Sequence, residues 1–148
     1  NKIGYYIASE ATKLMIEENV INFRRHLQMF PFNEHLSNED KTNHRTFMIE
    51  KTNFSIFLYG SGSKESGMFE EYKITKNNPN RIIIPIGSTG GTARIILEDV
   101  KNNLIKYPYL EKYINALENE NNPKILSRII LSIINENLKN SVKQNYHR

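Results

Sequence analysis

The sequence predicts a mixed α/β protein with a parallel sheet that is flanked by helices and followed by C-terminal helices. Two apolar segments with strand composition, residues 54–59 and 81–86, are each followed by a glycine-rich loop and then by a helical segment. Strands that alternate with helices in this way form parallel sheets with right-handed crossovers. Residues 82–86 are almost continuously apolar, which is typical of a strand covered on both faces.

The composition fits one folded domain, which we expect to span residues 1–148. Hydrophobic residues make up 39% and charged residues 24% of the chain, which excludes collagen-like and disordered classes. No apolar run approaches the ~18 residues of a membrane helix, so no membrane partner is expected. The net charge of +4 comes from scattered basic residues, so no nucleic-acid partner is expected either. The absence of Cys excludes disulfides and thiolate zinc sites and agrees with a cytoplasmic location.

The first part of the chain is predicted to contain a helix, a strand and a long loop. Apolar residues at spacings of three and four predict an amphipathic helix over residues 2–18, which Asn19 could end. Residues 20–32 are predicted to form a strand. Residues 33–43 are polar and predict a surface loop, and residues 44–51 predict one or two helical turns before the first apolar strand.

The second part repeats the strand, loop and helix pattern. Residues 60–63 form the first glycine loop, and residues 68–76 have helical composition. Residues 87–91 form the second glycine loop, and residues 92–106 predict a helix with a buried apolar face.

The last 42 residues, 107–148, are predicted to be a helical extension. A break at residues 107–109 precedes a short helix over residues 110–118, and a long helix begins at Pro123 after a polar turn. Seven apolar residues of the long helix fall on one face: Ile125, Leu126, Ile129, Ile130, Ile133, Ile134 and Leu138. This face packs either on the domain's own sheet or on another subunit or domain.

The glycine loops are the first candidates for a binding site. Ligands of parallel sheets bind beyond the carboxyl ends of the strands, where backbone N–H groups and helix N-termini favour phosphate. Four hydroxyl residues of the two loops could add donors: Ser61, Ser63, Ser88 and Thr89. Neither loop matches the dinucleotide fingerprint or the phosphate-loop motif, so ordinary turns between strand and helix remain an alternative.

Charged residues supply further candidates. Glu70 and Glu71 open the helix after the first loop and could accept a bond from a ribose hydroxyl. Four basic residues flank the long polar loop and could clamp a phosphate, or could simply be solvated: Arg24, Arg25, Lys41 and Arg45. The four His, at positions 26, 35, 44 and 147, lack metal-ligand spacing, so no metal or cofactor is expected. No G-x-S-x-G elbow is present.

Four segments of the chain carry a family resemblance: Arg45-Thr46-Phe47-Met48-Ile49, Ile56-Phe57-Leu58-Tyr59-Gly60, Gly67-Met68-Phe69-Glu70-Glu71-Tyr72 and Ile84-Pro85-Ile86-Gly87-Ser88-Thr89-Gly90-Gly91-Thr92-Ala93. Together they resemble the nucleotide-sensing branch of the SLOG (SMF/DprA–LOG) superfamily. The resemblance covers residues 2–105 and is strongest to the C-terminal sensor domains of Thoeris antiphage effectors. It implies a Rossmann-like domain that follows a Sir2-type NAD-consuming domain. It also implies that the domain binds a cyclic ADP-ribose isomer and thereby activates the effector.

The resemblance also implies which residues line the ligand. By motif position these are Arg45, Gly60, Glu71 and the loop Gly87, Ser88, Thr89, Gly90 and Gly91, with Arg25 near a strand end and Ser61 as a further donor. The family's first strand and first glycine loop would precede Asn1. A homo-oligomer is expected.

Two alternatives to the sensor stay open. The phosphoribohydrolase relatives carry P-G-G-x-G-T-x-x-E, which Tyr59-Gly60-Ser61-Gly62-Ser63 and a longer loop replace here, so we expect no catalytic residue in this domain. An enzyme that cuts an N-glycosidic bond would use Glu70 or Glu71 as its acid–base carboxylate. A pure assembly domain would rely on the helix over residues 125–138.

Overall fold

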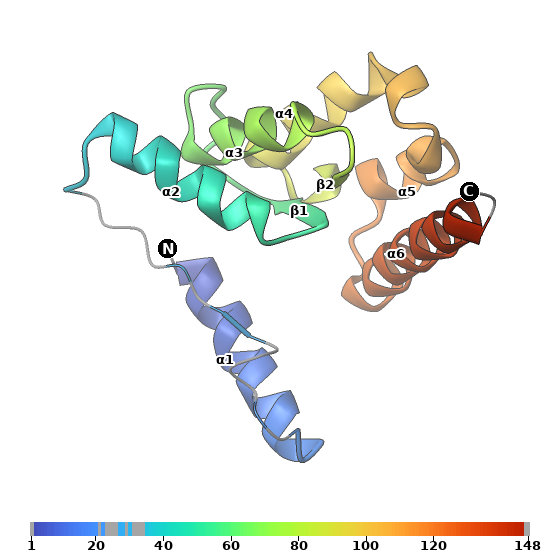
Figure 1. Ribbon diagram of the computed structural model, residues 1–148, viewed down its shortest axis with the longest axis horizontal. Coiled ribbons are helices and arrows are strands. Elements are labelled where there is room, and N and C mark those ends of the chain that lie inside the picture. Colours follow the sequence, from blue (N-terminus) through green and yellow to red (C-terminus); the bar gives the residue numbers. More distant parts are fainter. Residues whose placement is uncertain (1, 21, 23–26, 29, 31–34, 147–148) are drawn as a thin grey trace. The chain divides into compact units, whose positions relative to one another are not determined.

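The computed structural model describes residues 2–20, 22, 27–28, 30 and 35–146. The chain divides into two compact units, Asn1–Ser37 and Asn38–Arg148. Figure 1 shows both units. In the described part of the chain, no helix has the length and apolar character needed to cross a membrane.

The first unit contains helix α1, Lys2–Glu17, which confirms the helix predicted at the start of the chain. The predicted end at Asn19 is also confirmed, because this residue adopts a φ of 53° and the Val20 N–H bonds the Met15 carbonyl at 2.8 Å. A left-handed residue after the last turn commonly ends a helix. Most of the strand predicted over residues 20–32 lies outside the described residues.

The predicted loop over residues 33–43 is wrong from Asn38 onward, because helix α2 spans Asn38–Glu50. Glu39 and Asp40 lie in its first turn, where negative charge favours a helix N-terminus. Arg45 and Ile49, one turn apart, are buried, and α2 contacts α3. Packing of these two side chains stabilises a helix whose polar sequence gave little sign of it.

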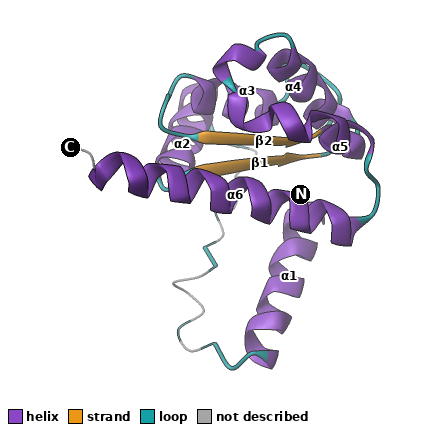
Figure 2. Ribbon diagram, turned by 90° about the vertical axis from the view of Figure 1, so that its right-hand side faces the viewer, coloured by secondary structure: helices purple, strands orange, loops and turns teal. Residues whose placement is uncertain are grey.

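The predicted parallel sheet is confirmed. Strand β1, Phe54–Leu58, pairs in parallel with β2, Ile82–Ile86, in a register that joins Phe54 to Ile82 and Leu58 to Ile86. Helix α3, Gly67–Lys76, connects them, and Ser66 caps it by accepting a bond from the Phe69 N–H at 3.2 Å. The strands lie side by side in Figure 2, with α3 and α4 on one side and α6 on the other.

The second glycine loop is more ordered than predicted. Residues Gly87–Thr89 form a short 3-10 helix, η2, and helix α4 spans Gly91–Lys101. The helix predicted to continue to residue 106 ends earlier, because the Asn103 side chain bonds the Asp99 carbonyl at 2.8 Å and the backbone turns there. A second 3-10 helix, η3, covers Leu104–Lys106.

The C-terminal extension is helical, as predicted. The short helix expected over residues 110–118 is a 3-10 helix, η4 (Pro108–Tyr113), followed by α5 (Ile114–Asn119). Helix α6 spans Pro123–Tyr146. Its Ile133 is buried in the core of this unit, whereas Ile125 and Leu138, near the two ends of the apolar face, are 40% and 48% exposed. The middle of the predicted face therefore packs on this unit's own core.

Candidate functional site

The carboxyl ends of both strands lie together, because Leu58 and Ile86 are partners in the parallel register. Tyr59 follows β1 and Gly87 follows β2, so the two predicted glycine loops meet at one edge of the sheet. This confirms the expected meeting of the two loops and places it where ligands of parallel α/β sheets bind.

The two loops are in direct backbone contact at Gly91. A Cβ on Gly91 would lie 2.8 Å from the Tyr59 carbonyl oxygen and closer still to that of Gly60. Gly91 also has a φ of 58°. The Ala93 N–H donates to the Tyr59 carbonyl at 2.8 Å, which fastens the start of α4 to the first loop. Gly91 thus has a structural reason to be glycine.

Threonine hydroxyls connect the loops as well. Thr89 Oγ1 accepts a bond from the Tyr59 N–H at 2.8 Å and donates to the Ile86 carbonyl at 2.6 Å. Thr92 Oγ1 accepts from the Gly62 N–H at 3.1 Å. Thr89, a predicted ligand residue, therefore holds the two loops in register through its hydroxyl.

The contacts of Thr89 lead to a prediction about stability. Thr89→Val keeps the shape of the side chain but removes both bonds, and we expect it to lower the free energy of unfolding by about 1–2 kcal/mol. Ser88→Ala, one residue earlier, is the control and should change that free energy by less than about 0.5 kcal/mol. Urea denaturation of both variants measures the difference. Equal losses in the two variants would contradict the bonding role of Thr89.

A pocket of about 460 Å³ opens at this edge of the sheet. Its walls come from the end of β1 and Tyr59, from Ser88 and Thr89, and from the segment that begins α6, including Asn121, Pro123 and Ser127. The Ser88 hydroxyl is buried and has no hydrogen-bond partner among the described residues. A buried polar atom without a partner is costly, and a bound ligand could supply the missing bond.

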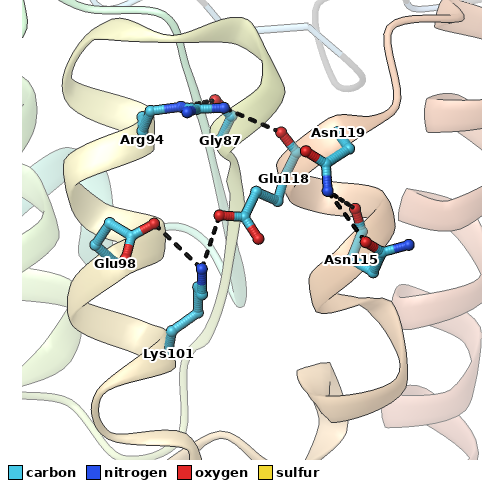
Figure 3. A network of polar contacts seen from close by, with 7 residues as sticks. All are labelled: Gly87, Arg94, Glu98, Lys101, Asn115, Glu118 and Asn119. Atoms are coloured by element: carbon cyan, nitrogen blue, oxygen red, sulfur yellow. Dashed lines mark hydrogen bonds and ion pairs between the residues drawn. The ribbon is translucent and has the colours of Figure 1, made fainter.

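A network of polar contacts joins Gly87 and helix α4 to helix α5 (Figure 3). The Arg94 guanidinium donates to the Gly87 carbonyl at 3.4 Å and to the Glu118 carbonyl at 3.3 Å. Lys101 pairs with the Glu118 carboxylate at 2.7 Å, and this bond lowers the pKa of Glu118. The loop after β2 and the end of α5, which leads into α6, are thereby connected.

Arg45 and Glu71 lie apart from this pocket, at the contact between α2 and α3. Arg45 Nη1 pairs with Glu70 Oε2 at 2.6 Å, and its Nε lies 3.7 Å from Glu71 Oε1. Thr42 donates a further bond to Glu70 at 2.8 Å. Burial raises the pKa of Glu71; the Arg45 charge opposes this rise and the Glu70 charge adds to it. Arg45, a predicted phosphate ligand, is thus engaged by two carboxylates.

A second hollow, of about 390 Å³, lies beside these residues. Arg45 and Glu70 line it together with three lysines: Lys41, Lys64 and Lys73. Because Lys64 belongs to the loop that follows Tyr59, this basic hollow adjoins the same loop as the pocket at the strand ends.

The remaining predicted residues are placed as follows. Gly60 has a φ of 98°, and a Cβ added to it would lie only 2.6 Å from the side chain of Thr92. Gly87 is buried against the side chain of Leu97. Ser61 is exposed. Gly90 has a φ of 77° and open space where its Cβ would be. Arg25 lies outside the described residues.

The sequence did not predict the wall formed by the start of α6. The available signal was Pro123, a favoured first helical residue, together with the wide apolar face that follows it. Among the described residues, no group of three or more His, Asp or Glu side chains is arranged to hold a metal ion.

A parallel sheet flanked by helices, with glycine loops and a pocket at its carboxyl edge, defines a Rossmann-like α/β domain. The chain belongs to the Sir2- and TIR-associating SLOG family, whose model matches residues 1–137. It is also similar to the NAD(+) hydrolase ThsA of Enterococcus faecium, with 29% identity over 70 residues. That alignment covers 43% of this chain and 14% of the relative, so the chain spans a small part of that protein's length. The resemblance to SLOG domains is confirmed.

Proposed function

We propose that this chain is the ligand-sensing domain of an antiphage effector and binds a cyclic ADP-ribose-type nucleotide at the carboxyl edge of its sheet. The observation that carries the proposal is the pocket of about 460 Å³ at the strand ends, with the unpartnered Ser88 hydroxyl in its wall. Pockets for small ligands commonly enclose about 300–1,000 Å³.

The lining of the pocket suits the uncharged parts of a nucleotide. Tyr59 lines the pocket, is 48% exposed and is expected to stack on a base, while Leu126 and Ile130 supply apolar surface. Ser88 and Asn121 are placed to bond ribose hydroxyls or base edges. Among the described residues, no charged side chain lines this pocket, so we expect it to hold the base and the ribose.

The diphosphate then lies along the glycine backbone at the same edge. Gly90 leaves open space above its Cα, and backbone N–H groups at the start of a helix attract anions. The basic hollow lined by Lys41, Lys64 and Lys73 adds positive charge beside the loop after β1. A single nucleotide would thus place its base and ribose in the pocket at the strand ends and its diphosphate toward the basic hollow.

The proposed effect of ligand binding comes from the family. SLOG domains of this family associate with Sir2 and TIR domains, and the similar protein from Enterococcus faecium is an NAD(+) hydrolase. We infer that nucleotide binding here switches on an NAD-consuming effector domain of the same protein, within a homo-oligomer in the cytoplasm. Support for a role of α6 in the switch comes from its first turns, which form one wall of the pocket.

Two substitutions test the location of the site. Gly90→Val places a branched side chain in the open space and is expected to abolish the rise in Tm that cyclic ADP-ribose isomers produce. Ser88→Ala removes one hydroxyl and should weaken affinity about two- to tenfold. Ser132→Ala, on a part of α6 outside the pocket, is the matched control and should bind as the wild type does. Thermal unfolding with and without the nucleotide measures all three.

Circular dichroism of the same samples separates misfolding from lost binding. Gly90→Val is expected to cost about 1–3 kcal/mol through its backbone conformation and to keep its secondary structure. Wild-type affinity in both folded Gly90→Val and Ser88→Ala would reject this edge of the sheet as the nucleotide site.

One observation favours a second candidate, an enzyme that cleaves an N-glycosidic bond. Burial raises the pKa of Glu71, as a general acid requires. Release of free base from nucleoside monophosphates, lost in Glu71→Gln, would support the enzyme. Without such release, the sensor is the better account of these residues.

A further inference from the structure

A third pocket lies at the opposite end of the sheet from the nucleotide site. It encloses about 470 Å³ between the end of α3, the start of β2 and the segment around η3. Arg81 and Ile82 line it at the amino end of β2, whereas Ser88 follows the carboxyl end of that strand. Five strand residues span about 17 Å, so this pocket is separate from the one at the carboxyl edge.

The lining of this amino-edge pocket is positively charged. Lys76, Arg81 and Lys106 line it, and none of its lining residues is Asp or Glu. Lys76 is paired with Asp99 at 2.6 Å. Lys106 is exposed and forms no ion pair within the described part of the chain. Among the described residues, the lining of this pocket therefore carries an excess of positive charge.

Arg81 offers an unused donor. Its Nη2 donates to the Glu50 carbonyl at 3.2 Å, which holds the guanidinium in place at the end of α2. Its Nε is buried and has no hydrogen-bond partner among the described residues. A buried, charged N–H without an acceptor is costly, and an anionic oxygen is the acceptor that it bonds most strongly.

Two tyrosines give the pocket rigid, neutral walls. Tyr109 donates its hydroxyl to the Ile83 carbonyl and accepts from the Ile83 N–H at 3.0 Å, so its ring is fixed against β2. The rings of Tyr107 and Tyr109 meet edge to face at 6.3 Å. Burial raises the pKa of Tyr109 to about 12, so its hydroxyl adds no negative charge at neutral pH.

We propose that the amino-edge pocket binds a small organic anion of mononucleotide size, a phosphate or carboxylate attached to a flat ring. The anionic group lies between the Arg81 Nε and Lys106, and the ring lies against the tyrosine walls. Asn77 and Asn78 add amide donors and acceptors at the rim. This site is additional to the nucleotide site at the carboxyl edge and does not depend on it.

Titration with adenosine monophosphate, followed by backbone amide resonances, tests the proposal. Saturable shifts are expected at Asn77, Asn78 and Lys106. Adenosine, which lacks the anion, and inorganic phosphate, which lacks the ring, should both bind more weakly. Lys106→Gln should weaken affinity roughly tenfold, since a charge-assisted bond is lost. Lys139→Gln removes the same charge from a residue that lines none of the three pockets and should leave affinity unchanged.

Arg81→Lys is the second variant, because it keeps the charge and removes the Nε donor; it should also weaken binding. The proposal is overturned if millimolar adenosine monophosphate causes no shifts at these amides, or if adenosine binds equally well. Equal losses in Lys106→Gln and Lys139→Gln would likewise overturn it, since they indicate diffuse attraction only. Shifts confined to Ser88 and Thr89 would overturn this site while supporting the one at the carboxyl edge, so the two proposals fail separately.

Discussion

Gly91→Ala is expected to lower the free energy of unfolding by about 3–5 kcal/mol, the largest loss of any single methyl addition in the two glycine loops. The new Cβ would collide with the carbonyl groups of Tyr59 and Gly60, which are backbone atoms at the end of β1. The φ of 58° adds strain for any residue with a side chain. Relief requires the start of α4 to move away from β1, which breaks the bond from Ala93 to Tyr59.

Chemical denaturation of Gly91→Ala and Gly90→Ala measures this effect with a matched control. Gly90 has a φ of 77°, but its Cβ would meet no atom within 4 Å. Gly90→Ala should therefore carry only the conformational cost, about 1–3 kcal/mol. If the two variants lost the same stability, the close approach of the loops at Gly91 would not be the cause.

Arg45→Met is expected to cost about 2–3 kcal/mol at neutral pH. The substitution keeps much of the buried side-chain volume but leaves the carboxylates of Glu70 and Glu71 without the cation that both contact. Breaking a buried ion pair costs more than breaking an exposed one, and the 40% exposure of the Glu70 side chain moderates the loss. Lys41→Met, on the same helix, removes an equal charge and should change stability by less than about 0.5 kcal/mol.

The Arg45→Met loss should also depend on pH. Burial already raises the pKa of Glu71, and removal of Arg45 deletes the charge that lowers it. The folded variant then keeps its proton at pH values where the unfolded chain, near pKa 4.5, has lost it. Stability of the variant therefore falls as pH rises above about 4.5, and its deficit relative to the wild type should be smaller at pH 5 than at pH 7. A deficit independent of pH would contradict this account of Glu71.

The sheet could be predicted from sequence because its signal is local. Residues 82–86 are apolar throughout, and β2 spans those residues. Helix α2 could not be predicted in full, because its first six residues are polar and the helix is stabilised by Arg45 and Ile49 packing toward α3. Propensity and periodicity carry no information about such a distant partner.

The same reasoning explains the candidate site. Parallel strands place Tyr59 and Ser88 at the same carboxyl edge of the sheet. The two walls of the pocket that these residues form could therefore be predicted from the sequence. The third wall depends on where α6 begins in space, which its apolar face does not specify. The pairing of Arg45 with Glu70 joins residues 25 positions apart, and no spacing rule foretells it.

Calorimetric titration of the chain with cyclic ADP-ribose isomers tests the central claim most directly. The pocket at the strand ends predicts saturable heat with one isomer, at one ligand per chain, and a clearly weaker signal with linear ADP-ribose. No heat with any isomer at hundreds of micromolar would contradict the assignment of this domain as a nucleotide sensor.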